Sequence, residues 1–190
     1  MKRIILILIL ELIMLSLIML VSSCRKQTDD GFDKFIVKAG ENECNGFRFH
    51  LYSRESLDFE FKVNSTWVWE DIIPAEVNGV SKICGFAESF DHKENRIVLG
   101  VKYVSGDIRL YGYGDANGVP FNGFICNIEV GGIYFCRMAI EGGYYVIRVN
   151  GCEYKHPRGS LHKIGVRLNP YVGGEYVLGH DWIVELKFYK

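Results

Sequence analysis

Apolar and polar residues alternate with a period of two through most of the chain. Phe59, Phe61 and Val63, for example, alternate with Glu60 and Lys62, which is typical of a β-strand with one buried and one solvated face. Beyond the N-terminal run, no window combines helical spacing of apolar residues with good helix formers. The alternation predicts strands at 35–37, 47–51, 59–63, 80–86, 96–103, 108–113, 121–130, 163–168 and 182–188.

The pair Asn150-Gly151, between two short β-type runs, is the strongest hairpin signal in the chain. A two-residue type I′ turn requires positive φ at both central positions, and this pair tolerates it. That turn places Arg148 opposite Glu153, which is a favourable cross-strand charge pair. The other face of the hairpin then carries Tyr145, Ile147, Val149, Cys152 and Tyr154.

Turn residues separate the strands at short intervals. The segment 115–118, Asp-Ala-Asn-Gly, predicts a hairpin turn rather than a calcium loop, because the oxygen ligands of such a loop are incomplete. With Gly-Gly pairs at 131–132 and 142–143, residues 97–154 are predicted to form one continuous antiparallel meander. Many short strands and almost no helix indicate an all-β, antiparallel two-sheet sandwich or jelly roll, with an up-and-down barrel as the alternative.

The N-terminus has the features of an export signal. Basic residues at positions 2 and 3 precede an apolar run over 4–21, as in a signal peptide. Glu11 interrupts that run, and a carboxylate inside a membrane-spanning helix costs roughly 2.5–3.5 kcal/mol, so a retained membrane anchor is the second interpretation. Residues 20–24, Leu-Val-Ser-Ser-Cys, resemble the bacterial lipobox, which implies cleavage after Ser23 and lipidation of Cys24.

The lipobox divides the chain into a lipoprotein signal peptide at 1–23, a flexible tether at 24–31 and a single β-sandwich domain at 32–190. Asp29 and Asp30 resemble the acidic signal that follows the lipidated cysteine in Bacteroidetes lipoproteins. The prediction is a membrane-anchored lipoprotein of the outer membrane whose domain lies on the periplasmic or cell-surface face. The alternative is an ordinary secreted protein with a chance cysteine.

The charge and the cysteine content of the chain exclude some classes of binding partner and cofactor. The net charge of −1 at pH 7 without a basic block argues against nucleic acid. No C-x-x-C pair occurs, so no metal site and no cofactor is predicted. Six cysteines minus Cys24 leave five. Cys126 and Cys136 flank Gly131-Gly132 and are the best candidates for a disulfide, with buried thiols as the alternative.

Several short motifs resemble a family of Bacteroidales lipoproteins. They are KICGF at 82–86, His92, Arg96, LYGY at 110–113, VNG at 149–151, NPYVGGE at 169–175 and His180-Asp181. Members of that family are similar in having a concanavalin A-like jelly roll behind a lipoprotein signal, and their function is unassigned. The resemblance implies the fold and brings no catalytic residue with it. Relatives often carry adjacent histidines where this chain has His92.

The sequence contains no clear catalytic constellation. Glu88, Asp91 and Glu94 are spaced i, i+3, i+6, whereas a strand aligns acids for glycoside cleavage at i, i+2, i+4. A solvated loop is the preferred interpretation of these acids. No Gly-x-Ser-x-Gly elbow and no His-Glu-x-x-His motif occurs, so no catalytic residue is assigned.

Two groups of residues are candidates for binding. Sugar rings pack on aromatic faces while nearby polar groups bind hydroxyls, and Tyr111 and Tyr113 share one face of a strand whose other face carries Ile108 and Leu110. The full set of candidate glycan-binding residues is Tyr111, Tyr113, Trp67, Trp69 and Tyr171. A candidate polar site consists of Glu175, His180 and Asp181, although such side chains more commonly fix a loop by hydrogen bonds to the backbone.

The leading hypothesis for function is therefore a membrane-anchored lipoprotein whose jelly roll binds carbohydrate without catalysis. Its expected partners are the membrane, through the lipid on Cys24, and a polysaccharide or glycan. One alternative is a glycoside hydrolase or polysaccharide lyase of jelly-roll fold, which needs an acid and a base that converge in a cleft. The other is a protein-binding adhesion or structural subunit, which needs a large exposed apolar patch.

Overall fold

The computed structural model describes residues 28–45, 50–52, 55–69, 79–88, 94–159, 165–173 and 177–189. The predicted signal peptide and Cys24 lie outside these residues. Within the described ranges, no helix is long and apolar enough to cross a membrane. The elements are β1 (Asp33–Val37), β2 (Leu51–Tyr52), β3 (Ser56–Lys62), the 3₁₀ helix η1 (Ser65–Trp67), β4 (Ser81–Ala87), β5 (Arg96–Val104), β6 (Asp107–Ala116), β7 (Val119–Ile128), β8 (Ile133–Glu141), β9 (Tyr144–Val149), β10 (Cys152–Pro157), β11 (Gly165–Leu168) and β12 (Trp182–Phe188).

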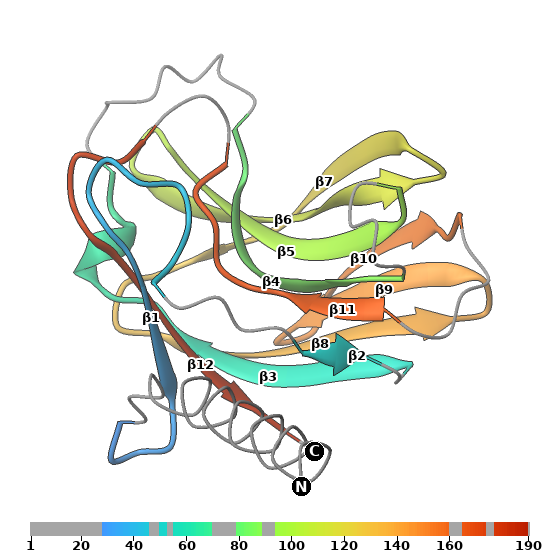
Figure 1. Cartoon of the computed structure of the whole chain (residues 1–190), viewed down its shortest axis with the longest axis horizontal. Coiled ribbons are helices and arrows are strands. Elements are labelled where there is room, and N and C mark those ends of the chain that lie inside the picture. Colours follow the sequence, from blue (N-terminus) through green and yellow to red (C-terminus); the bar gives the residue numbers. More distant parts are fainter. Residues whose placement is uncertain are drawn as a thin grey trace, which may run out of the picture.

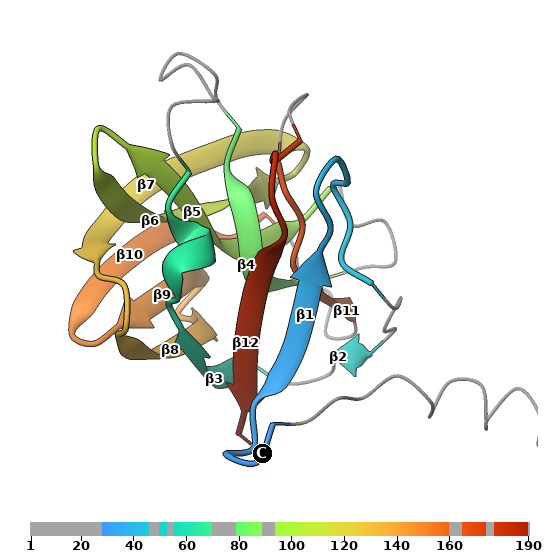
Figure 2. The same cartoon turned by 90° about the vertical axis from the view of Figure 1, so that its left-hand side faces the viewer.

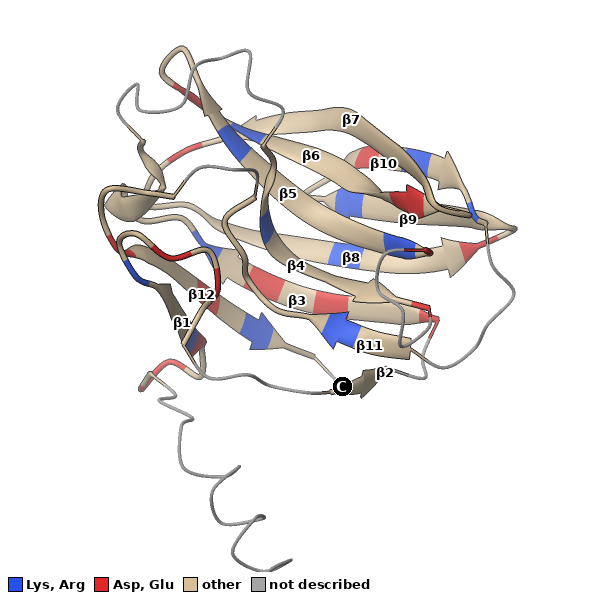
Figure 3. Cartoon of the chain, turned by 45° about the horizontal axis from the view of Figure 1, so that its top comes forward, with Lys and Arg blue, Asp and Glu red and all other residues tan. Residues whose placement is uncertain are grey.

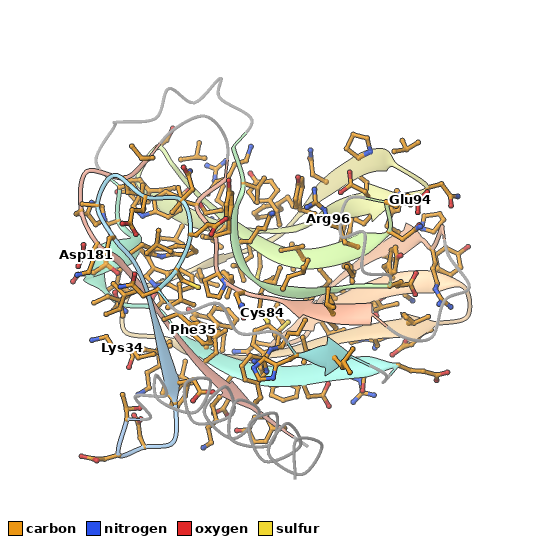
Figure 4. The ribbon with its side chains drawn as sticks, viewed as in Figure 1. Lys34, Phe35, Cys84, Glu94, Arg96 and Asp181 are labelled. Carbon is orange, nitrogen blue, oxygen red and sulfur yellow. The ribbon has the colours of Figure 1, made fainter. Side chains whose placement is uncertain are left out.

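The strands form two antiparallel sheets that lie one above the other in Figure 1. The first sheet has the order β1-β12-β3-β8-β9-β10, and the second has the order β2-β11-β4-β5-β6-β7. The predicted two-sheet jelly roll is confirmed, and the alternative of a single closed barrel is wrong. Both sheets turn one apolar face inward: Phe35 of the first and Cys84 of the second lie between the layers in Figure 4 and are 1% exposed.

Alternation determines the core as predicted. In β3, Phe59 and Phe61 are fully buried while Glu60 between them is partly exposed. The predicted strand at 47–51 is described only from residue 50, and Leu51 belongs to β2. The strands at the two ends of the described chain pair with each other, with Asp33 of β1 opposite Leu186 of β12, as Figure 2 shows. The first sheet is therefore assembled from both ends of the domain.

The hairpin at Asn150-Gly151 forms with the predicted register. Both residues have positive φ, at 44° and 94°, and Arg148 pairs with Glu153 across the turn. The Arg148 guanidinium donates a hydrogen bond of 2.7 Å to the Glu153 carboxylate. The turn between β6 and β7 also forms at the expected place, because Asn117 has a φ of 53°.

The continuous meander predicted for 97–154 is wrong at one connection. β7 pairs with β6 in the second sheet, whereas β8 pairs with β3 and β9 in the first. Residues 129–132 therefore carry the chain from one layer to the other. Gly131-Gly132 predicts a hairpin turn, but glycine favours a crossing between layers equally well, so the pair does not distinguish the two kinds of connection.

This crossing also removes the predicted disulfide. Cys126 and Cys136 lie in different sheets, and all five described cysteines are free thiols. Cys126 instead shares a hydrogen bond with the thiol of Cys152 on β10, and burial together with this bond raises the pKa of Cys126 to about 12. The alternative interpretation, thiols that act as small apolar groups, describes the structure.

Glycines let the free edges of the two sheets come together. β10 of the first sheet approaches β7 and β6 of the second to within 8 Å between Cα atoms. The ring of Tyr154 occupies the space beside Gly112 and Gly123, where an added Cβ would lie 2.1 Å and 2.3 Å from ring atoms. The sandwich is closed at this edge because neither position carries a side chain.

Candidate ligand-binding face

The second sheet has an outer face, turned away from the core, and the strand register fixes which residues share it. Lys82 of β4 pairs with Gly100 of β5, Gly100 with Tyr111 of β6, and Tyr111 with Phe124 of β7. As predicted, Tyr111 is on the outer face of β6 and its neighbour Leu110 is buried on the inner face. On one side of this row, the next row of the outer face consists of Gly85, Val98, Tyr113 and Asn122, and the row after it of Ala87, Arg96, Asp115 and Pro120. The row on its other side consists of Lys102, Arg109 and Asn127.

The outer face is curved and has an apolar floor. In Figure 1, β4 and β5 bend so that their concave side faces away from the first sheet. Val98 at the centre is fully buried, and the side chain of Val80 occupies the space above Gly100, where a Cβ would be 2.1 Å from Val80 Cγ1. The long side chains of Lys82 and Tyr111 flank this floor from β4 and β6.

Three cations of this region lie over aromatic rings. They are Lys82 over Tyr171 at 4.6 Å from the ring centroid, Arg96 over Tyr113 at 5.4 Å and Lys102 over Tyr111 at 5.5 Å. Each such contact contributes about 0.5–1 kcal/mol at an exposed site. A fourth ring, Phe124, is 54% exposed and meets Tyr111 edge-on with centroids 6.0 Å apart. Rings and positive charges thus alternate across one side of the molecule.

The two sheets differ in how their outward charges are balanced. The first sheet interleaves acids and bases, and its ion pairs include Arg137–Asp58, Arg148–Glu141, Arg148–Glu153 and Lys155–Glu153. In the second sheet, Arg96 binds Asp115 and Arg109 binds Asp107, and no described carboxylate forms an ion pair with Lys82 or Lys102. Figure 3 shows these basic positions along β4, β5 and β6.

The environment of Lys82 disfavours its charge. Burial, and secondarily repulsion by the Arg96 guanidinium, lowers the pKa of Lys82 to about 8, with the Asp115 carboxylate acting in the opposite direction. Burial also lowers the pKa of Lys102. An ammonium that is partly stripped of water and lies near a like charge gains more than an exposed lysine does from an incoming anion.

Arg96 is held by two neighbours on β6. Its Nε donates to the Asp115 carboxylate, and its Nη2 donates to the hydroxyl of Tyr113 at 3.2 Å. The side chains of Arg96 and Asp115 are each 11% exposed. This pair therefore fixes the position of Tyr113, while Lys82 and Lys102 have no such partner among the described side chains.

The predicted platform residues Trp67 and Trp69 are in the core, which corrects that part of the glycan-binding set. They are 0% and 5% exposed. Trp67 belongs to the 3₁₀ turn η1, which is capped by the side chain of Asn64. Trp67 stacks on Phe61 with centroids 5.9 Å apart and donates its Nε1–H to the Ile183 carbonyl at 2.8 Å. Neither ring is accessible to a sugar.

His180 and Asp181 of the predicted polar site make hydrogen bonds to neighbouring loops, which agrees with the preferred interpretation of these residues. Asp181 accepts hydrogen bonds from Lys38 at 2.6 Å and from the Ala39 amide at 3.1 Å. His180 contacts the Thr66 carbonyl through Nε2 at 3.1 Å. Figure 4 shows Asp181 and Arg96 at opposite ends of the domain. Glu175 lies outside the described residues.

Of the acids predicted to lie on a solvated loop, Glu88 is not solvated. Glu88 is 3% exposed, accepts from Arg158 Nε at 2.6 Å and from the Tyr145 hydroxyl at 2.7 Å, and so links β4 to the first sheet. Burial and this bond raise the pKa of Tyr145. Glu94 is exposed, and Asp91 lies outside the described residues. Both Glu88 oxygens are occupied, so this carboxylate is a structural partner of Arg158.

Comparison with known proteins identifies the fold. No protein-family model matches the chain, and no curated protein matches it in sequence. Among solved structures it is similar to the PL7 alginate lyase AlyA1 from Zobellia galactanivorans, with a TM-score of 0.53 at 15% identity over 84% of this chain and 76% of that one. It is also similar to the alginate lyase AlyC3 in complex with dimannuronate, with a TM-score of 0.56 at 9% identity over 84% of this chain and 73% of that one.

A functionally unknown protein from Saccharomyces cerevisiae has the same fold, with a TM-score of 0.53 at 11% identity over 84% of this chain and 86% of that one. Identities this low show a shared jelly roll and carry no residue roles across. The site must therefore be argued from the side chains of this chain.

Proposed function

We propose that the outer face of the second sheet binds polysaccharide. The observation that carries this proposal is the set of three cation–aromatic contacts on one side of the molecule, around Tyr111, Tyr113 and Tyr171. Aromatic rings pack against the C–H faces of sugars, and flanking ammonium and guanidinium groups donate hydrogen bonds to their oxygens. The likeness in fold to alginate lyases, one of them in complex with dimannuronate, supports this choice of ligand.

Removal of single rings tests the proposal. Tyr111→Ala and Tyr113→Ala should each weaken binding of the purified chain to a responsive polysaccharide by about tenfold, or about 1.4 kcal/mol. Tyr144→Ala is the matched control, because Tyr144 is 46% exposed but lies on β9 of the first sheet. Binding would be measured by affinity electrophoresis and calorimetry against a polysaccharide panel. Equal affinities for all four proteins would show that this face is not the site.

A polysaccharide lyase is the second candidate. The observation that favours it is the hydrogen bond of 3.2 Å from Arg96 to the Tyr113 hydroxyl, because this bond holds the hydroxyl on the outer face, where a lyase needs a general base or acid beside the sugar. Prolonged incubation with polyuronates distinguishes the two: a lyase releases unsaturated sugars that absorb in the ultraviolet, whereas a binding protein returns the polymer intact. Loss of that product in Tyr113→Phe would assign the activity to Tyr113.

We also propose that Cys24 carries the lipid that anchors this domain. β1 starts and β12 ends at the same end of the first sheet, with Asp33 opposite Leu186, and the concave side of the second sheet faces the other way (Figure 1). An anchor that precedes β1 would therefore leave the outer face of the second sheet directed away from the membrane. Labelling with a fatty-acid analogue should mark the wild type and not Cys24→Ala, and equal labelling of both would refute the anchor.

A further inference from the structure

Positive charge on the outer face of the second sheet extends along the strands as well as across them. Lys102 and Arg109 are paired across β5 and β6, Lys82 lies at the level of Gly100, and Arg96 lies four residues further along β5. With a rise of about 3.4 Å per residue, the distance along β5 from Lys102 to Arg96 is roughly 20 Å. This length suits several units of a chain ligand better than one small anion.

The charges along this line are not equivalent. Arg96 is neutralised by Asp115, and Arg109 is bound to Asp107. Lys82 faces Tyr171 on the neighbouring segment, Arg96 on β5 and Asp115 on β6. The charges of Arg96 and Asp115 cancel each other, so the positive charge of Lys82 is not compensated. Lys102 has only the ring of Tyr111 as a described partner. Two ammonium groups, one on each side of the apolar floor, therefore remain available to a ligand.

Excess charge in a partly buried position is unfavourable for the free protein. A lysine that is desolvated and near an arginine lowers stability unless something negative approaches it. In the first sheet, several exposed bases have an acid beside them, as Arg137 has Asp58 at 3.0 Å. Lys82 and Lys102 form no ion pair with a described carboxylate and lie among the rings of the proposed binding face, which points to an anionic ligand.

We infer that the outer face selects polysaccharides whose sugar units carry an oxyanion, either a carboxylate or a sulfate, and that Lys82 and Lys102 are the residues that bind this negative charge. The inference rests on the proposed function, because the rings that hold the sugar are those of that proposal. Tyr111 and Tyr113 supply contact with any sugar chain, whereas the two lysines distinguish a charged chain from its neutral counterpart. Removal of the tyrosines should therefore weaken binding of charged and neutral chains alike, whereas removal of the lysines should weaken binding of the charged chain only.

The same arrangement makes binding dependent on pH. Lys82 loses its proton as the pH rises through about 8 in the free protein, and a bound anion holds that proton more tightly. The affinity for a polyanion should therefore fall as the pH is raised from 7 to 9, and affinity for a neutral chain should not. Tyr171, Arg96, Asp115 and Lys102 are the other charged or titratable groups named at this site.

The test uses the full chain in mild detergent and four probes: polygalacturonate, its methyl ester, a sulfated galactan and neutral dextran. Polygalacturonate should bind at least tenfold more tightly than its methyl ester, which has the same backbone without the charge. Lys82→Met and Lys102→Met should each remove most of that difference. Lys155→Met on β10 is the matched control, since Lys155 is an exposed lysine of the first sheet, and it should leave the difference intact.

The outcomes separate this inference from the proposed function. If polygalacturonate and its ester bind equally while Tyr111→Ala still abolishes binding, the charge inference is overturned and the binding face stands. If no probe binds, the proposed function fails with it. A sulfated galactan that binds like polygalacturonate identifies any oxyanion as the ligand group, and one that does not bind identifies the carboxylate. An equal loss in Lys155→Met would show nonspecific attraction and refute the site.

Discussion

Replacement of Lys82 by methionine should stabilise the protein while it weakens polyanion binding. The pKa of Lys82 is lowered from 10.5 to about 8, first by burial and then by Arg96. Each pKa unit corresponds to about 1.4 kcal/mol, so a protonated Lys82 costs the folded state up to roughly 3 kcal/mol. Methionine has a similar length and no charge, but it also loses the contact with Tyr171. We expect the free energy of unfolding at pH 7 to rise by about 1–3 kcal/mol.

The pH dependence of this gain tests its origin. Between pH 8 and 10.5 the folded wild type releases the Lys82 proton while the unfolded chain keeps it, so the stability of the wild type rises with pH relative to the variant. The advantage of Lys82→Met should be full below about pH 8 and should disappear near pH 10.5. Urea unfolding of both proteins at several pH values measures it. Lys155→Met should change stability by less than about 0.5 kcal/mol.

Two results would refute the reasoning. A Lys82→Met protein that is less stable than the wild type at pH 7 would show that the lysine is favourably solvated or paired. A gain that persists unchanged at pH 10.5 would show that it comes from packing and not from charge.

Three further predictions concern the packing between the sheets. Gly112→Ala should destabilise the fold by about 1–3 kcal/mol in urea unfolding, because the new methyl group would lie 2.1 Å from a ring atom of Tyr154; a neutral effect would contradict this packing. Glu88→Gln should lower the free energy of unfolding by about 3 kcal/mol, because it removes the charge partner of Arg158, whose side chain is only 15% exposed, and a change below about 0.5 kcal/mol would contradict a strong Glu88–Arg158 pair. Under mild oxidation, peptide mapping should find Cys126 linked to Cys152, each thiol giving up one hydrogen to the oxidant, and a link to another cysteine would contradict the observed edge contact.

The period of two was sufficient to predict the strands and their buried faces. Phe59 and Phe61 are buried as the alternation requires, and the Asn150-Gly151 turn fixed the register of its hairpin. The connection at 129–132 was not predictable in the same way, because a Gly-Gly pair serves a hairpin and a crossing between layers equally well. Local signals describe strands, and the choice of sheet depends on contacts between distant segments.

The candidate site was only half predictable. Tyr111 and Tyr113 were placed correctly by alternation, but Trp67 and Trp69 were not, because a 3₁₀ turn after Asn64 directs both indoles inward. The sequence pattern did not identify the lysines of the outer face as candidate binding residues. A signal did exist, since Lys102 and Lys82 lie directly opposite Arg109 and Gly100 rather than opposite an acid, but it becomes visible only when the register of β4, β5 and β6 is known.

The four strands β4 to β7 are consecutive in the chain, from Ser81 to Ile128, and they carry every residue of the proposed binding face except Val80 and Tyr171. The first sheet, in contrast, draws strands from both ends of the domain. A single recombination event, with junctions before β4 and in the crossing at 129–132, would therefore exchange almost the whole binding surface as one cassette. Ligand preference in such a scaffold can change by replacement of one gene segment, while the first sheet is inherited intact.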